Sequence, residues 1–109
     1  MNDTRKTSEP IYSTLAEDPD LGPIVEMFVE EMPGRIAGLL AWLESGNKEE
    51  LRRAAHQLKG AAGSYGFQPI TPAAARLEET IRQGSSEEEI HRAVGELVDL
   101  CRRAAAGRP

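Results

Sequence analysis

Hydrophobic residues recur at helical spacing in four stretches of the chain. In the first stretch, at about 100° per residue, one apolar stripe stays within roughly 60° of its centre; it consists of Val25, Phe28, Val29, Met32, Ile36, Leu39, Leu40 and Leu43. Asp20 is the expected N-cap, Pro23 fits the first turn, and Gly46 ends the helix. Because the stripe keeps its phase through Pro33, we expect a kinked continuous helix or two nearly collinear helices.

The second stretch begins at Asn47, which is followed by Glu50 at the spacing of a helix-capping pair. Its apolar side consists of Leu51, Ala54, Ala55, Leu58, Ala62 and Tyr65. Gly66 supplies a stop signal after this stripe. The pattern therefore predicts a helix from about Asn47 to about Tyr65.

Two further helices follow from similar signals. Thr71 is the expected cap of the third, with Pro72 at its first position, a buried edge at Ala74, Leu77 and Ile81, and an end at Gly84. Ser86 and Glu89 form a capping box at the start of the fourth. Its stripe is Ile90, Val94, Leu97 and Cys101, so Cys101 is predicted to be a small buried hydrophobic residue.

Residues 1–17 lack such a stripe, and we expect a flexible, polar N-terminal tail. Thr14 and Glu17 have capping-box spacing, which predicts a short helical turn at Ile11–Glu17 across one end of the molecule. Short loops between the four long helices favour an antiparallel order. The sequence therefore predicts an all-α fold: an antiparallel up-down four-helix bundle over residues 18–106, preceded by a short N-terminal helical segment.

Composition narrows the classes of function. A chain of 109 residues with a net charge of −5 predicts one domain and argues against nucleic acid as a partner. The single cysteine excludes an internal disulfide. Neither a signal peptide nor an apolar run of membrane-spanning length is recognisable, so we expect a cytoplasmic monomer that makes no membrane contact.

His56 stands out on the polar side of the second helix. With Leu51 at zero, His56 lies at about 140°, and four neighbours fall between about 80° and 180°: Arg52, Lys59, Gly60 and Gly63. A glycine inside a helix costs about 0.5–1 kcal/mol relative to alanine. We interpret the two glycines as leaving room for another protein to approach the imidazole, which the nearby cations suit as a nucleophile towards phosphorus.

The segment His56-x-Leu58-Lys59-Gly60, followed by Gly63 and Gly66, resembles the motif of histidine phosphotransfer (HPt) domains of two-component phosphorelays. The resemblance extends from about residue 18 to about residue 105. It implies that His56 carries the phosphoryl group, Lys59 steadies it, and Arg52, Gly60 and Gly63 belong to the docking surface. Expected partners are receiver domains of response regulators and a sensor or hybrid histidine kinase. No cofactor is expected on this chain, since Mg²⁺ would belong to the receiver.

Glu78 falls where the resembling family often carries an acid or a glutamine facing the histidine. A carboxylate there would orient the imidazole but repel the phosphate; the alternative is an ordinary solvated carboxylate. We interpret His91, which precedes Arg92 on the outer face of the last helix, as solvated. A metal site is disfavoured because His56 and His91 lie on different helices without ligand-spaced acids between them.

No Gly-rich phosphate loop or nucleotide motif is recognisable, so the expected activity is that of a phosphocarrier without its own kinase activity. Two other interpretations remain open. The chain is then either the phosphoacceptor domain cut from a larger histidine kinase or a helical adaptor that is not phosphorylated.

Overall fold

The computed structural model describes residues 9–107, and this part of the chain holds four α-helices and one pair of two-residue strands. The elements, in chain order, are β1 (Ile11–Tyr12), α2 (Gly22–Ser45), α3 (Lys48–Ser64), α4 (Ile70–Arg82), α5 (Glu87–Arg103) and β2 (Ala104–Ala105). The prediction of an all-helical fold with four helices is confirmed for these residues.

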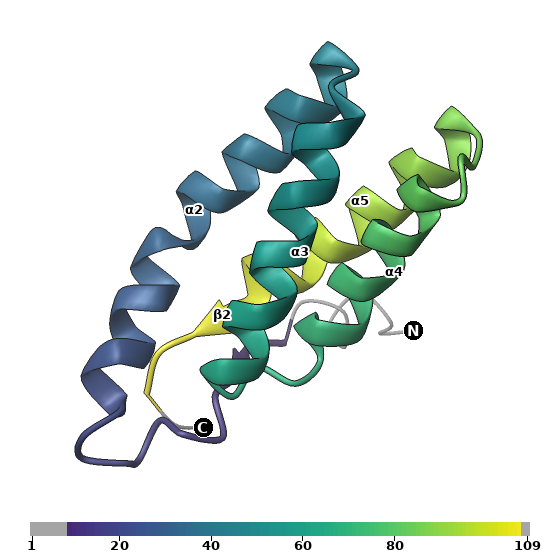
Figure 1. Cartoon of the computed structure of the whole chain (residues 1–109). Helices are drawn as coiled ribbons and strands as arrows, with labels where there is room; N and C mark the ends of the chain where they lie inside the picture. The colour runs from purple at the N-terminus through teal and green to yellow at the C-terminus, as the bar shows by residue number, and fades with distance from the viewer. Residues whose placement is uncertain (1–8, 108–109) are drawn as a thin grey trace, which may run out of the picture.

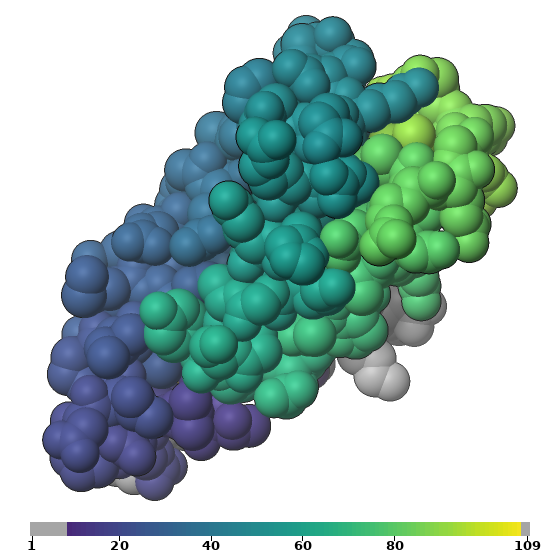
Figure 2. All heavy atoms as spheres, in the orientation of Figure 1, coloured from purple at the N-terminus to yellow at the C-terminus, as the bar shows by residue number. Residues whose placement is uncertain are grey.

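The helices pack side by side around one core. The α2–α3 and α4–α5 connections lie at one end of the molecule, and the α3–α4 connection lies at the other (Figure 1). Each helix contacts two others: α3 packs against α2 and α4, and α5 packs against α4 and α2. In the space-filling view, α2, α3 and α4 form one face, with α3 between the other two (Figure 2). Helix α3 therefore lies at the surface between α2 and α4.

Helix α2 runs unbroken through Pro33. A proline in a helix interior costs about 3 kcal/mol, whereas burying one Val, Leu, Phe or Met side chain gains about 1.5–3 kcal/mol. Four such side chains of α2 are buried on one stripe: Val25, Phe28, Met32 and Leu39. Their burial outweighs the lost hydrogen bond, which explains why the phase of the sequence pattern survives the proline.

The start of α2 differs from the prediction. Asp20 is not the N-cap; Leu21 occupies that position and its side chain makes no capping hydrogen bond. The carboxylate of Asp18 instead accepts hydrogen bonds from the backbone N–H groups of Asp20 and Leu21, at 2.8 and 3.0 Å. The predicted end is confirmed, since Gly46 caps the helix with a φ of 74°.

The capping predictions hold for α3 and α5 but not for α4. Asn47 accepts a hydrogen bond from the N–H of Glu50, and Ser86 and Glu89 form a complete capping box. Helix α4 begins two residues early, at Ile70, because the turn after the buried Phe67 runs directly into it. Thr71 is therefore inside the helix, and its hydroxyl is buried without a hydrogen-bond partner in the structure.

The predicted helical turn at Ile11–Glu17 is wrong. Ile11 and Tyr12 instead pair in parallel with Ala104 and Ala105, which follow α5, and hydrogen-bonded turns continue from Thr14 to Glu17. The Ser13 hydroxyl donates to the carbonyl of Tyr65, and the Thr14 N–H donates to that of Gly66. This segment closes the end of the bundle where α3 ends. The part of the predicted tail at residues 1–8 lies outside the described residues.

The core is built from all four helices and the loop after α3. Phe28 and Phe67 stack with ring centroids 5.3 Å apart. The Tyr65 ring also packs against Phe28, with ring centroids 5.2 Å apart. Cys101 is buried as predicted, and its burial raises the pKa of the thiol to about 12. In the described part of the chain, no helix is both long and apolar enough to cross a membrane.

Candidate functional site

Helix α3 buries one side and exposes the other. Leu51, Ala55, Leu58 and Ala62 are buried, which fixes the rotation of the helix. His56 consequently projects outward, and 63% of its side chain is exposed. The exposed position expected from the sequence is thus where the structure places it.

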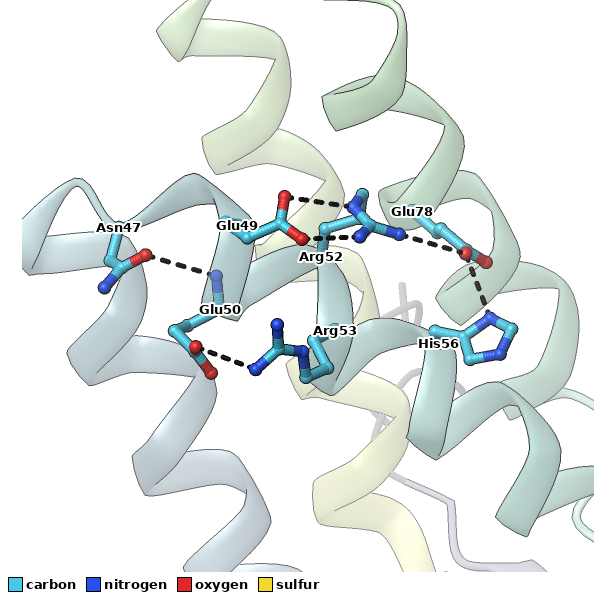
Figure 3. Close-up of polar contacts among 7 residues, drawn as sticks. All are labelled: Asn47, Glu49, Glu50, Arg52, Arg53, His56 and Glu78. Atoms are coloured by element: carbon cyan, nitrogen blue, oxygen red, sulfur yellow. Dashed lines mark hydrogen bonds and ion pairs between the residues drawn. The ribbon is translucent and has the colours of Figure 1, made fainter.

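Glu78 of α4 points at His56 (Figure 3). Its Oε2 atom lies 3.0 Å from Nδ1 of His56, and its Oε1 atom accepts a hydrogen bond of 2.9 Å from Nζ of Lys59. Only 7% of the Glu78 side chain is exposed. Of the two interpretations open for Glu78, the solvated carboxylate is therefore wrong. The structure joins His56, Lys59 and Glu78 in one hydrogen-bonded group, which we call the histidine triad.

The pKa of Glu78 is lowered from its ordinary value. The hydrogen bond from Lys59 is the main cause, and it outweighs burial, which acts in the opposite direction; the hydrogen bond with His56 lowers the pKa further. Glu78 is therefore ionised at neutral pH. An ionised carboxylate can only accept hydrogen bonds, so Nδ1 of His56 carries the proton and donates the hydrogen bond to Glu78.

This arrangement leaves the other ring nitrogen available. In a neutral imidazole with its proton on Nδ1, the lone pair is on Nε2. Figure 3 shows the second ring nitrogen on the side of the ring away from Glu78. Since the ring is mostly exposed, Nε2 is the nucleophilic atom that a partner protein can reach.

Arg52 is tied to a carboxylate that the sequence argument did not consider. Its guanidinium contacts Glu49 at 2.6 Å and lies 3.9 Å from Oε2 of Glu78 (Figure 3). The hydrogen bond with Glu49 is the main cause that raises the pKa of Arg52. The i, i+3 spacing from Glu49 to Arg52 was the available sequence signal. Arg52 is paired with Glu49 and Lys59 with Glu78, so both cations beside His56 already have a carboxylate partner.

Gly60 and Gly63 are exposed on the side of α3 that bears His56. A Cβ atom at Gly60 would meet nothing within 4 Å, and one at Gly63 would make an ordinary contact of 3.7 Å with the Thr71 hydroxyl. Packing therefore requires a glycine at neither position.

The sequence model of the Hpt domain family matches residues 23–107. The chain belongs to the Hpt domain family. Hpt domains are phosphocarriers of two-component phosphorelays and interact with receiver domains and histidine kinases. Comparisons with curated proteins and with solved structures give no match.

The second histidine of this Hpt domain is also exposed. His91 lies near the start of α5, and its Nδ1 is 2.9 Å from the backbone carbonyl of Glu87 in the same helix. Gly95 follows His91 at the spacing at which Gly60 follows His56, and a Cβ there would also meet nothing within 4 Å. A glycine one turn after a histidine is thus not by itself a signal for the site.

Among the described residues, no group of three or more His, Cys, Asp or Glu side chains is arranged to hold a metal ion.

Proposed function

We propose that His56 is the phosphoacceptor of this Hpt domain and exchanges a phosphoryl group with receiver-domain aspartates. The observation that carries the proposal is the histidine triad: an exposed imidazole whose Nδ1 is held by a buried, ionised carboxylate. The course of the helices in Figure 1 supports the antiparallel up-down order of the bundle that presents it.

The transfer is a displacement at phosphorus. The Nε2 lone pair attacks the phosphorus of an aspartyl phosphate on the receiver; the N–P bond forms as the bond from phosphorus to the aspartate oxygen breaks, and the carboxylate leaves with the electron pair. The imidazole gains positive charge in this step while keeping its Nδ1 proton. The ionised Glu78 stabilises that charge at hydrogen-bond distance. In the second step an aspartate oxygen of another receiver attacks the phosphorus, the N–P bond breaks with its electron pair returning to Nε2, and the ring returns to its neutral form.

Lys59 has a role in each state. Before transfer its ammonium keeps Glu78 ionised, and after transfer the phosphoryl oxygens on Nε2 compete with Glu78 for it. An ammonium about 4 Å from a unit negative charge gains about 4 kcal/mol at an effective dielectric constant near 20. Exposure of the site reduces this to about 1 kcal/mol. The site therefore steadies a phosphoryl group, and the receiver must supply most of the stabilisation of the transition state.

The experiment is labelling of the purified domain by a panel of receiver domains carrying radioactive aspartyl phosphate. Wild type and His91→Gln should acquire acid-labile label, and His56→Gln should acquire none. Incubation with ATP and Mg²⁺ alone should leave all three proteins unlabelled. Label on His56→Gln would overturn the assignment, and labelling of wild type but not His56→Gln by ATP alone would overturn the carrier in favour of a kinase.

A further inference from the structure

The buried carboxylate of Glu78 has three basic neighbours, all on α3. Nζ of Lys59 lies 2.9 Å from Oε1, Nδ1 of His56 lies 3.0 Å from Oε2, and Nη1 of Arg52 lies 3.9 Å from the same Oε2. The first two contacts are hydrogen bonds, and the third is an ion pair at longer range. Arg52 is thus the one neighbour that has not closed on the carboxylate.

Helix α5, the other helix packed against α4, adds no ion pair to Glu78 in the described part of the chain. The ion pair printed between these two helices joins Glu96 to Arg76, at 3.0 Å. The ionisation of Glu78 therefore depends on side chains of α3.

The duty of Lys59 changes when His56 carries phosphate. Its hydrogen bond is the main cause that lowers the pKa of Glu78, while burial acts in the opposite direction. In the proposed function, the phosphoryl oxygens on Nε2 compete for the same ammonium. If Lys59 turns to them, Glu78 loses its first partner and stays buried beside a new negative charge. Both conditions favour protonation of a carboxylate.

The nearest proton is the one on Nδ1 of His56. If it moved to Oε2 of Glu78, the phosphorylated ring would be left neutral. On transfer to a receiver aspartate, the N–P bond would then break to give an imidazolate anion, which is a poor leaving group. A ring that keeps the Nδ1 proton leaves as neutral imidazole. The phosphorylated state therefore needs another cation at Glu78.

The guanidinium of Arg52 is held where it can supply that charge. Its Nε and Nη2 atoms donate to Glu49, at 3.5 and 2.6 Å, which turns Nη1 towards Glu78 (Figure 3). A hydrogen bond from a guanidinium to a carboxylate is about 2.7–2.9 Å long, so a movement of about 1 Å would close the contact. The fork of an arginine can serve both carboxylates at once.

In the resting state the influence between Arg52 and Glu78 is small. The pKa of Arg52 is raised first by its hydrogen bond with Glu49 and least by the charge of Glu78. Conversely, the causes that lower the pKa of Glu78 begin with Lys59 and do not include Arg52. While Lys59 is in place, Arg52 is a reserve.

We propose that Arg52 is a positioning residue that takes over the Glu78 carboxylate when Lys59 turns to the phosphoryl group on His56. This inference rests on the proposed function, because it takes the phosphoryl group as the anion that draws Lys59 away. Arg52 then keeps the proton on Nδ1, and the phosphoryl group stays transferable.

The first test needs neither phosphate nor partner. Lys59→Ala imitates the departure of Lys59, and the titration of the Glu78 carboxylate is followed by NMR with and without Arg52→Gln. In the wild-type background Arg52→Gln should change the titration midpoint little. In the Lys59→Ala background it should raise the midpoint clearly, beyond the sum of the two single effects. Arg53→Gln removes a cation that pairs with Glu50, and it should change neither background.

The second test measures transfer from phosphorylated His56 to a saturating receiver. Arg52→Gln should slow this step by about fivefold, the scale of one partly exposed ion pair. Arg52→Lys keeps the charge without the fork and should be faster than Arg52→Gln. Arg53→Gln should match wild type within twofold. Circular dichroism checks that every variant is folded.

The outcomes separate the two proposals. An equal effect of Arg52→Gln in both backgrounds, or normal transfer at saturation with weaker receiver binding, would overturn the role of Arg52 and leave the proposed function standing. A larger effect in the Lys59→Ala background, together with a wild-type protein that no phosphorylated receiver labels, would support the exchange of cations at Glu78 and overturn the proposed function.

Discussion

The two histidines of this Hpt domain share three local features. Both are exposed on a helix, and both have Nδ1 within hydrogen-bonding distance of an oxygen. Both are followed after four residues by a glycine where an added Cβ would meet nothing within 4 Å. The oxygen differs. For His56 it belongs to a buried carboxylate on another helix, and for His91 it is a backbone carbonyl one turn earlier in its own helix.

The charged surroundings differ as well. The carboxylate beside His56 is itself held by Lys59, with Arg52 nearby, so cations gather where a phosphoryl group would arrive. His91 follows Glu87, Glu88 and Glu89 in the first turns of α5, and these carboxylates would repel a phosphoryl group. Exposure makes a histidine reachable, and in the proposed function the carboxylate brought to His56 by α4, together with Lys59 of its own helix, suits it to carry phosphate.

The largest expected effect tests the open surface beside each histidine. Gly60→Leu should reduce transfer from a receiver by more than 100-fold, because the leucine side chain keeps the partner from the separation of about 3–3.5 Å that reaction requires. Stability should rise by about 0.5–1 kcal/mol, since leucine favours helix and a Cβ atom at this position meets no neighbour within 4 Å. Gly95→Leu is the matched control; it should gain similar stability and transfer normally. The measurements are labelling rates and thermal melting. A lowered melting temperature in Gly60→Leu would instead show that Gly60 is needed for packing.

An intermediate effect is expected at Glu78, the buried carboxylate that contacts His56. Glu78→Ala should slow transfer by about 30-fold, about 2 kcal/mol, the range of a hydrogen bond to a charged group. Glu78→Gln keeps an acceptor for Nδ1 without the charge and should recover part of that loss. Single-turnover transfer kinetics measure both, with the exposed Glu79→Ala as control. Equal rates for Glu78→Ala and Glu79→Ala would mean that the ring needs no partner.

The smallest effect is expected at the ammonium. Lys59→Ala should slow transfer or shorten the phosphohistidine lifetime by about tenfold, about 1.4 kcal/mol. Binding of the unphosphorylated receiver should change little, because the charge matters only once the anion is near. Arg53→Ala on the same helix removes an exposed cation paired with Glu50 and serves as the control. A large loss of receiver binding in Lys59→Ala, with normal transfer at saturation, would make Lys59 a docking residue.

The features that depend on neighbours along the chain could be predicted from the amino-acid sequence. The apolar stripes predicted four helices, the caps at Asn47 and Ser86 predicted where two of them begin, and the polar side of α3 predicted that His56 is exposed. These features follow from helix periodicity and from hydrogen bonds over three or four residues, which a sequence displays directly. The same local reasoning failed where distant contacts compete, as at Ile11 and Tyr12, whose backbone pairs with the residues after α5 instead of forming a helical turn.

The burial of Glu78 against His56 and Lys59 depends on how α3 and α4 pack together. The position of Glu78 in the sequence shows that it is on α4, but not how far α4 is shifted along α3 or how it is rotated. Those two quantities are set by how the side chains of the helices interdigitate, and residues 22 positions apart meet only after that packing is complete. The same packing keeps Glu78 from water and ties it to Lys59, so the ionised carboxylate that distinguishes His56 from His91 is a property of two helices together.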